Sequence, residues 1–556
     1  MRAFAVVVSP KEALLKSSKE VAREWQGAID SEFASMIDAG TVAIVPPSEV
    51  GPDDELIPSL LILTEKENGR KKARLVACGN HQAALPDGCY SSVVKHSSWM
   101  VLLAILVPLG CEVGLVDVKT AFLQTDAPET SSEKRTFLRL PSVFTKYYSP
   151  GVDFKMFLEV LKSVYGLSDA PKNWKITLVK YFGELGFKPC AYDDCILLRT
   201  NPFGVVVVYV DDLLLFCFGR NLLDALIGNI RARFKTTEPK FLRDASRLDP
   251  LSFIAHEIYV ERKDGERQLV VSMETYLRTA LRSLCEKKVI GSPEDLAPLH
   301  SLKKEMFEAG TLQQGERLSP EELTLLRTGI GCLAYAAQAI RWDILVPLSQ
   351  LASGQSQAGT RAHLEGLRAL ISYVNSTIGR SVQWPLPEKP LCDFPKPFVI
   401  KVECEFDSNL PMEKSRQGLV FRVTAIQSGE FLCCFGLTST QKTISLSSCE
   451  SELKAASWAS KQLIGEINLL SEVFKDAIFH KHLVGDNEST NLISNNQCSI
   501  RRVRHLVLAD LFVKEITASG FVKVRSRRTA EMAADFLTKV LPETKLRTLL
   551  PLANLH

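Results

Sequence analysis

Two adjacent aspartates, Asp211 and Asp212, lie inside one of the most apolar stretches of the chain. Four valines precede Tyr209 and Val210, and three leucines follow Asp212. Burying ionised carboxylates costs several kcal/mol each unless a partner compensates for the lost hydration. A tight turn between two strands would hold both acids at a sheet edge, where Mg²⁺ would neutralise them because it binds carboxylate oxygens. For this tetrapeptide alone, a plain Asp-Asp hairpin turn is the alternative.

A third aspartate, Asp117, leaves another apolar strand in the segment 114–122. Three carboxylates on neighbouring strands can hold two metal ions about 3.5–4 Å apart. One ion would activate a primer 3′-hydroxyl, and the other would hold a triphosphate and its leaving pyrophosphate. An ordinary aspartate at the end of a strand is the alternative for Asp117.

Length and composition set the limits of the architecture. A chain of 556 residues predicts about three to five domains. The 14 cysteines include no Cys-x-x-Cys pair, which argues against a zinc module and against a secreted disulfide framework. The apolar stretch Trp99–Cys111 is shorter than the roughly 20 residues of a spanning helix, so we expect a buried core helix there. The N-terminus does not make a convincing signal peptide.

Charge points to nucleic acid only locally. The formal net charge of +3 is too small to identify such a partner. Three basic clusters could neutralise phosphates, with solvated surfaces as the alternative. Their members are Lys71, Lys72 and Arg74; Arg501, Arg502, Arg504 and His505; and Lys523, Arg525, Arg527 and Arg528.

Periodicity predicts an alternation of helices and strands. We expect helices over 18–40, 97–110, 172–186, 274–285, 320–352, 359–376 and 447–475. Extended segments are expected over 59–80, 111–118, 204–218, 398–446 and 481–486, and a Pro-rich linker over 377–397.

Four motifs in order resemble those of the copia-type retroelement reverse transcriptases. They are Lys72-Ala73-Arg74-Leu75-Val76-Ala77; Val116-Asp117-Val118-Lys119-Thr120-Ala121-Phe122-Leu123; Val164-Tyr165-Gly166-Leu167 with Ala170-Pro171 and Trp174; and Tyr209-Val210-Asp211-Asp212. Between the two predicted sites, Phe253–Glu257, Gly331–Tyr335 and Arg341-Trp342-Asp343 are similar to the connecting region of that family.

This resemblance implies roles for the first site. Asp117, Asp211 and Asp212 would be the catalytic metal ligands. Lys72 and Arg74 would grip the triphosphate, Phe122 would stack under the sugar, and Tyr209 would also contact substrate. A solvated basic turn and a core phenylalanine are the alternatives for Lys72, Arg74 and Phe122. Asp169 departs from the family, which usually has Gln before Ala-Pro.

Four dispersed acids after residue 395 resemble the ribonuclease H part of the same family. Glu403, Glu450, Asp486 and Asp535 would be its catalytic metal ligands, and Arg502–His505 its basic segment. The family has Asp where this chain has Glu403, so Glu405 or Asp407 could substitute. A capping box at Ser447 and Glu450, an Asx turn at Asp486 and a solvated Asp535 are the alternatives.

The resemblance also implies an architecture. We expect a multidomain chain of the α+β and α/β classes, shaped as a right-hand polymerase and followed by a ribonuclease H-like domain. The expected divisions are fingers and palm over 1–235, a thumb-like part over 236–300, a connection region and linker over 301–395, the ribonuclease H-like domain over 396–545 and a tail over 546–556.

The implied function is RNA-directed DNA polymerase activity coupled to cleavage of the RNA strand of hybrids. It calls for two Mg²⁺ per active site, with Mn²⁺ as the alternative metal. The expected partners are an RNA template, a DNA primer, an RNA–DNA hybrid and deoxynucleoside triphosphates, with no membrane. The expected location is a cytoplasmic virus-like particle or the nucleus.

A degenerate or co-opted protein that binds nucleic acid without catalysis is the competing interpretation. The intact Asp117, Asp211 and Asp212 favour the enzyme, whereas Asp169 and Glu403 favour the binding protein. The zinc knuckle, protease and integrase of a complete polyprotein have no matching motif, so we expect a processed fragment, a truncated gene or a degenerate copy.

Overall fold

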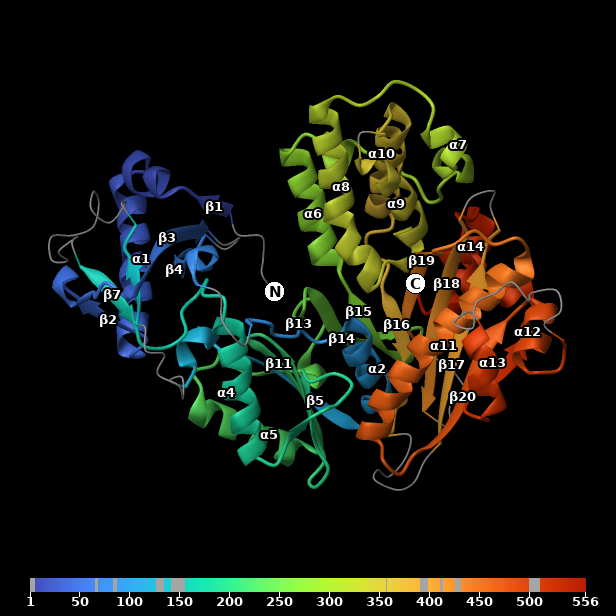
Figure 1. The fold of residues 1–556 in the computed structure, drawn as a ribbon, viewed down its shortest axis with the longest axis horizontal. Coiled ribbons are helices and arrows are strands. Elements are labelled where there is room, and N and C mark those ends of the chain that lie inside the picture. Colours follow the sequence, from blue (N-terminus) through green and yellow to red (C-terminus); the bar gives the residue numbers. More distant parts are fainter. Residues whose placement is uncertain are drawn as a thin grey trace.

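The chain is a mixed α/β protein of several units. The computed structural model describes residues 6–65, 69–83, 88–126, 135–141, 156–356, 358–390, 399–410, 414–425, 432–499 and 511–556. Four β-sheets organise this part of the chain. Figure 1 shows the N-terminal sheet on the left, a group of helices at the top and the C-terminal sheet on the right. None of the helices in the described ranges is long and apolar enough to cross a lipid bilayer.

The first sheet and α1 (Lys19–Asp38) form the N-terminal unit. Its strands are β1 (Val6–Val8), β2 (Val42–Val45), β3 (Glu55–Glu65), β4 (Lys71–Ala77), β6 (Thr136–Arg139) and β7 (Phe157–Val160). The helix expected over 18–40 is confirmed as α1, in which Trp25 and Ile29 are buried and which contacts β4. The predicted extended pair is also confirmed, because β3 and β4 are antiparallel neighbours.

The second sheet is the central sheet, with strand order β12-β5-β11-β10-β9-β8. Its strands are β5 (Cys111–Asp117), β8 (Lys188–Pro189), β9 (Ile196–Arg199), β10 (Gly204–Tyr209), β11 (Asp212–Phe218) and β12 (Lys240–Phe241). Three helices accompany it: α2 (His96–Leu106), α4 (Ala170–Glu184) and α5 (Arg220–Arg233).

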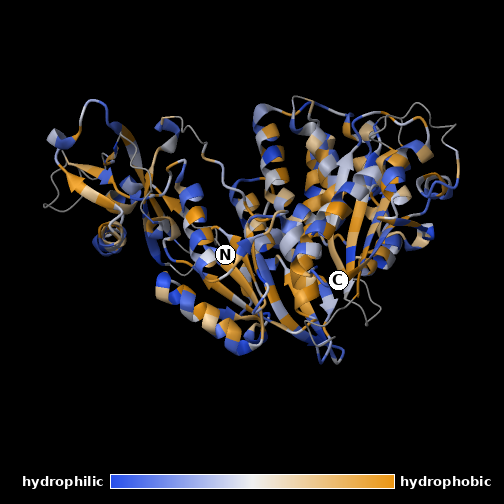
Figure 2. Ribbon diagram, turned by 60° about the horizontal axis from the view of Figure 1, so that its bottom comes forward, coloured by the Kyte–Doolittle hydropathy of each residue, from blue (hydrophilic) through white to orange (hydrophobic). Residues whose placement is uncertain are grey.

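Burial on both faces explains the continuous apolar run of β10. Val205 and Val207 belong to the core that contains α2, whereas Val206 and Val208 pack with residues of α4 and α5. A strand covered on both faces reads as an unbroken hydrophobic run rather than an alternating one. Figure 2 shows hydrophobic residues gathered along the strands, while several outer helices carry hydrophilic faces.

A third sheet and a group of helices follow. The sheet contains β13 (Leu251–Phe253), β14 (His256–Lys263), β15 (Glu266–Ser272) and β16 (Val382–Pro385). The helices are α6 (Glu274–Glu286), α7 (Ala309–Leu312), α8 (Pro320–Ala339), α9 (Leu345–Leu351) and α10 (Arg361–Ser376). The expected linker over 377–397 therefore contains a strand, β16, that pairs with β15.

The helix expected over 320–352 is interrupted at Arg341–Asp343 by a buried ion pair. Arg341 donates to both oxygens of Asp343 at 2.9 Å, and Arg380 donates to Asp343 at 2.7 Å. These two guanidinium groups hold the pKa of Asp343 well below its usual range, against the opposing effect of burial. The resemblance in this segment thus corresponds to a structural link between α8, α9 and the end of α10.

The C-terminal unit is built on a five-stranded sheet of order β19-β18-β17-β20-β21. Its strands are β17 (Val399–Ser408), β18 (Arg416–Ala425), β19 (Leu432–Thr440), β20 (Ile478–Gly485) and β21 (Lys523–Ser526), and its helices are α11 (Ser448–Val473), α12 (Glu488–Ser494), α13 (Phe512–Ala518) and α14 (Glu543–Leu552). The division expected at 545/546 falls inside α14, in which Leu546, Leu549 and Leu550 are buried, and Leu555 after the helix is buried as well.

Glycine is required where β4 crosses the loop that carries Gly166. The φ of Gly166 is +90°, and an added Cβ would lie 2.1 Å from the carbonyl oxygen of Ala77. We expect Gly166→Ala to lower the free energy of unfolding by at least about 3 kcal/mol, because strain and overlap add. Chemical denaturation measures this loss. Gly183→Ala in α4 is the control, since its Cβ would meet nothing within 4 Å; equal stability of the two variants would contradict the prediction.

Candidate functional site

The three predicted aspartates of the first site lie at one end of the central sheet. Asp212 begins β11 and stands in register with Asp117, the last residue of β5. Asp211 is in a two-residue turn after Tyr209, and Val210 in that turn has a φ of +54°. The backbone N–H of Val118 donates to the carbonyl of Asp211 at 2.8 Å, which fixes the turn against the end of β5. The predicted hairpin is therefore present.

The three aspartates are neighbours at the end of the sheet, but their carboxylates do not form a compact ligand group. Asp117 and Asp211 line the same cleft, and all three acids are half-buried. Within the described residues, the groups of three metal-ligating side chains with atoms within 4.8 Å of one another do not include this trio. Carboxylate oxygens suit Mg²⁺ chemically, and binding one ion by all three acids would require their side chains to turn toward each other.

Trp174 holds the turn that carries Asp211. Its indole N–H donates to the carbonyl of Val210 at 2.6 Å, and its ring is buried with an edge against Phe234. Because a positive φ is costly for a branched residue, this hydrogen bond stabilises a strained backbone beside the acids. The sequence placed Trp174 in a motif but did not predict this contact.

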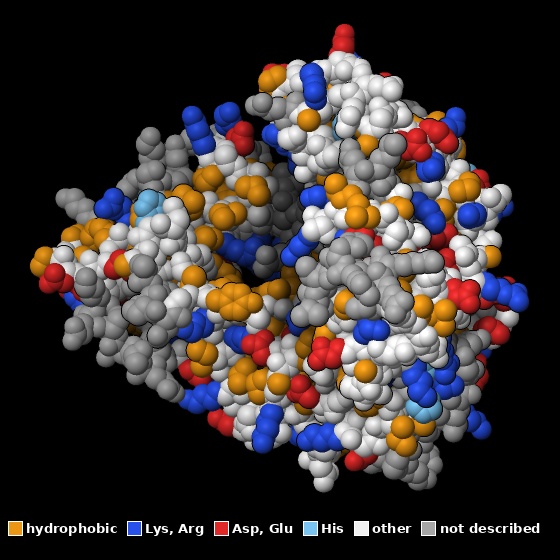
Figure 3. All heavy atoms as spheres, turned by 45° about the vertical axis from the view of Figure 1, so that its right-hand side comes forward, with side chains coloured by type: hydrophobic (Ala, Val, Ile, Leu, Met, Phe, Trp, Pro, Cys, Tyr) orange, Lys and Arg blue, Asp and Glu red, His pale blue; other side chains and the backbone are white. Residues whose placement is uncertain are grey.

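A cleft faces Asp117 and Asp211 from the side of the N-terminal unit. Lys72 and Arg74 of β4 line it, together with Phe122 and Tyr165. The Arg74 guanidinium lies 5.7 Å from the Tyr165 ring centroid, and the Phe122 and Tyr165 rings meet edge to face at 5.6 Å. Figure 3 shows a deep hollow in this molecule with Lys and Arg side chains on its wall. The cleft thus brings basic and aromatic groups to the acids.

Glu32 of α1 is a cleft residue that the sequence did not reveal. Its carboxylate accepts from the backbone N–H of Leu75 at 3.3 Å. Burial raises the pKa of Glu32, while that hydrogen bond and the charges of Lys72 and Arg74 oppose the rise. Glu32 therefore helps to fix the strand from which both basic residues project.

Tyr209 and Asp169 lie outside this cleft wall. The Tyr209 ring meets Phe253 of β13 edge to face at 6.5 Å, and the residue is absent from the cleft lining. Asp169 accepts from the side-chain amide of Asn173 at 3.2 Å, one turn along α4. The expected contact between Tyr209 and substrate remains a prediction.

A second acid cluster lies in the C-terminal unit. Asp407 near the end of β17, Glu452 in the first turns of α11 and Asp486 after β20 have carboxylate oxygens within 4.8 Å of one another. Burial, opposed by Lys539, and then the nearby charge of Asp535 raise the pKa of Asp407 to about 7. Burial followed by the charges of Asp407 and Asp486 raises the pKa of Glu452.

These features fit a divalent cation. The Glu452 Oε2 atom is buried without a hydrogen-bond partner, so an oxygen ligand is available in the cluster. A bound cation would offset the mutual repulsion of the three carboxylates and favour their ionised forms. Asp535 stands close enough to raise the pKa of Asp407, and it forms an ion pair with Lys539 at 2.7 Å.

The structure does not bring Glu403 and Glu450 into this cluster. Glu403 forms buried ion pairs with Arg422 at 3.0 Å and Arg527 at 2.7 Å. It precedes Asp407 by four strand positions, or about 13 Å. Glu450 instead pairs with Lys454 at 2.7 Å and accepts from the backbone N–H of Leu446 at 2.8 Å.

The ligand roles expected for Glu403 and Glu450 therefore gain no support from this cluster. Glu450 and Glu452 differ by about 200° around the helix, so only one of them can face β17. The clustered acids on these two elements are Asp407 and Glu452, not Glu403 and Glu450. The predicted segment Arg502–His505 lies outside the described residues.

The comparisons with known proteins bear on the first site. Residues 49–248 match the family described as reverse transcriptase (RNA-dependent DNA polymerase). All four motifs of the first site fall inside that range. The chain is related to the copia/Ty1-type retrotransposon Pol proteins.

Copia/Ty1-type proteins match far more of the chain than residues 49–248. The retrovirus-related Pol polyprotein from transposon TNT 1-94 of Nicotiana tabacum is 25% identical over 88% of this chain and 34% of its own length. The transposon Ty1-GR3 Gag-Pol polyprotein of Saccharomyces cerevisiae is 23% identical over 88% of this chain and 26% of its own length. The chain thus spans about a third or less of these two relatives.

A solved structure is also similar to this chain. It is a foamy viral protease-reverse transcriptase in complex with an RNA/DNA hybrid. The TM-score is 0.46 at 10% identity, covering 91% of this chain and 54% of that one.

Proposed function

We propose that this chain is an RNA-directed DNA polymerase whose C-terminal unit cleaves the RNA strand of RNA–DNA hybrids. One observation carries the polymerase proposal: Asp117 stands in register with Asp212 beside the turn of Asp211, and the adjoining cleft contains Lys72 and Arg74. A cleft with acids that could hold metal and cations that could bind phosphate suits a metal-bound triphosphate.

The cleft residues have distinct roles in this proposal. Arg74 binds phosphate oxygens through the paired N–H donors of its planar guanidinium, and Lys72 binds them through its ammonium group. Phe122 packs under the sugar of the incoming deoxynucleotide. Asp117, Asp211 and Asp212 would hold two Mg²⁺ ions, with Mn²⁺ as the alternative, and these ions supply positive charge for the phosphate oxygens during transfer.

We further propose that the C-terminal unit is ribonuclease H-like. Asp407, Glu452, Asp486 and Asp535 would hold metal for the hydrolysis of an RNA strand. This set keeps Asp486 and Asp535 from the sequence and replaces the other two acids. In this scheme the N-terminal unit corresponds to fingers, the central sheet to a palm, and the helices from α6 to α10 to thumb and connection.

Primer extension tests the proposal. We expect the purified chain to extend a DNA primer on an RNA template with Mg²⁺ and deoxynucleotides, and to stop completely when EDTA removes the metal. Added Mg²⁺ should restore extension, because all the proposed ligands are carboxylate oxygens. Filter binding of the same primed template is the parallel measurement.

The competing function is nucleic-acid binding without catalysis. It is favoured by the absence of the trio Asp117, Asp211 and Asp212 from the compact ligand groups of the described residues. A chain that binds the primed template tightly but never extends it, with Mg²⁺ or Mn²⁺, would establish that function and refute the polymerase.

A further inference from the structure

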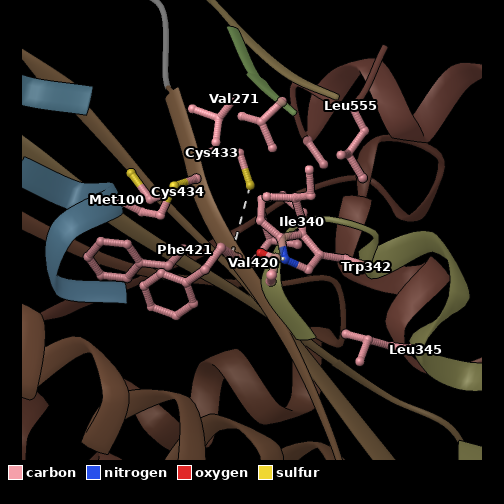
Figure 4. Close-up of a cluster of buried hydrophobic side chains, with 14 of the residues drawn as sticks. Met100, Val271, Ile340, Trp342, Leu345, Val420, Phe421, Cys433, Cys434 and Leu555 are labelled. Atoms are coloured by element: carbon pink, nitrogen blue, oxygen red, sulfur yellow. Dashed lines mark hydrogen bonds between the residues drawn. The ribbon is translucent and has the colours of Figure 1, made fainter. Parts of the chain in front are cut away.

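The central sheet and the C-terminal unit share one hydrophobic core. Residues 98–106 of α2 are all buried, and this part of the helix has no polar face. A helix that is apolar all round needs cover on every side. The central sheet covers one side, and β18, β19 and α11 contact the helix as well. Figure 4 shows Met100 of α2 beside Cys434 of β19 in this shared core.

A polar contact lies at the edge of that core. The Glu472 carboxylate on α11 accepts from the backbone N–H of Ala191 at 2.8 Å and of Tyr192 at 3.3 Å. Both donors belong to the loop between β8 and β9 of the central sheet. The Tyr192 hydroxyl also donates to Glu466 of α11 at 3.5 Å.

Gly465 makes this contact sterically possible. A Cβ at that position would lie 2.4 Å from the Tyr192 hydroxyl oxygen, so the ring rests directly on the backbone of α11. The Lys95 ammonium also lies 3.6 Å from the Tyr192 ring centroid and donates to the Tyr192 carbonyl at 3.3 Å. Tyr192 therefore contacts both α11 and Lys95, the residue that precedes α2. We call this arrangement the Tyr192 contact.

The Tyr192 contact connects the two acid sites through rigid elements. After Tyr192 the chain enters β9, which pairs with β10, and β10 leads into the turn of Asp211. On the other side, α11 is one helix of 26 residues with Glu452 near its start and Glu472 near its end. At 1.5 Å per residue, these two glutamates are about 30 Å apart along the axis.

We propose that Tyr192 and Glu472 are positioning residues that fix the spacing between the two acid sites. On the proposed function, a hybrid that leaves the first site would reach the second after a constant length. The RNA strand would then be cut at a constant distance behind the primer terminus. A loosened contact lets α11 shift against the central sheet. The distance between the two sites then varies, although neither set of acids is changed.

The test compares Tyr192→Ala, Glu472→Ala and Glu472→Gln, with Ser471→Ala on the exposed side of α11 as control. Amide hydrogen exchange of Ala191 and Tyr192 reports the contact itself. We expect exchange to rise at least tenfold in Glu472→Ala and less in Glu472→Gln, which keeps an oxygen acceptor. RNA fragment lengths are then measured on a hybrid with a chain-terminated primer. We expect one narrow length distribution in wild type and in the control.

In Tyr192→Ala and Glu472→Ala we expect the distribution to broaden over several nucleotides, while extension rate and total cleavage stay within twofold of wild type. Faster amide exchange with unchanged fragment lengths would refute the spacing role. Unchanged exchange in Glu472→Ala would refute the contact. A wild-type chain that neither extends nor cuts would refute the proposed function and the spacing role together, whereas the exchange result still decides whether the contact exists.

Discussion

Asp211→Asn is expected to lower the single-turnover rate of primer extension by roughly a thousandfold. The substitution keeps the shape of the side chain and removes the negative charge that a metal ion requires. Both hydrogen bonds that fix the turn end on backbone carbonyls: the Val118 backbone N–H donates to that of Asp211, and the Trp174 indole N–H donates to that of Val210. Neither involves the Asp211 side chain, so both survive the change. Affinity for the primed template should therefore change little.

Asp53→Asn serves as the matched control for this variant. Asp53 is exposed in a turn outside the cleft, so the same chemical change should leave extension unaltered. If Asp211→Asn retained extension within about tenfold of wild type, Asp211 would not be a metal ligand. A variant that lost template binding in parallel would point instead to a damaged fold.

Asp407→Asn is expected to reduce RNA cleavage by roughly a thousandfold and to leave primer extension unchanged. The pKa of Asp407 is raised to about 7 in the folded chain. From its ordinary value up to pH 7, the folded state binds a proton that the unfolded state has lost, so this group makes stability fall as pH rises. Asn removes that dependence on pH. The midpoint temperature of thermal unfolding at pH 8 should therefore be no lower in Asp407→Asn than in wild type.

Glu403→Gln is the comparison that separates the two assignments. It weakens buried ion pairs with Arg422 and Arg527. We expect a loss of about 2 kcal/mol in the free energy of unfolding, because hydrogen bonds to charged groups contribute on that scale. At a temperature where both variants are folded, Glu403→Gln should still cut RNA. Loss of cleavage in Glu403→Gln with retention in Asp407→Asn would restore the assignment made from the sequence.

The first site could be predicted from the sequence because its signal is local. The apolar run around Asp211 and Asp212 can be buried only as a strand pair, and pairing with β5 brings Asp117 alongside. The second site could not be resolved in the same way. Glu403, Glu405 and Asp407 alternate along β17 and share one face. The arginine that engages the first two, Arg422, comes from the neighbouring strand.

Side-chain contacts between segments that are distant in the sequence could not be predicted. The break after α8 depends on Asp343 meeting Arg380 from beyond α10. The Tyr192 contact includes the packing of Tyr192 on Gly465 of α11, two residues that are far apart in the sequence. Neither pairing follows from periodicity, since periodicity reports only which face of an element is apolar.

The burial of α2 from two sides bears on how this molecule can be dissected. A fragment that stops before β17 would lose the cover that β18, β19 and α11 give to this helix, and Met100 and its neighbours would meet water. Exposed apolar surface of that kind promotes self-association. Point substitutions in the intact chain are therefore the sounder way to study either proposed activity alone.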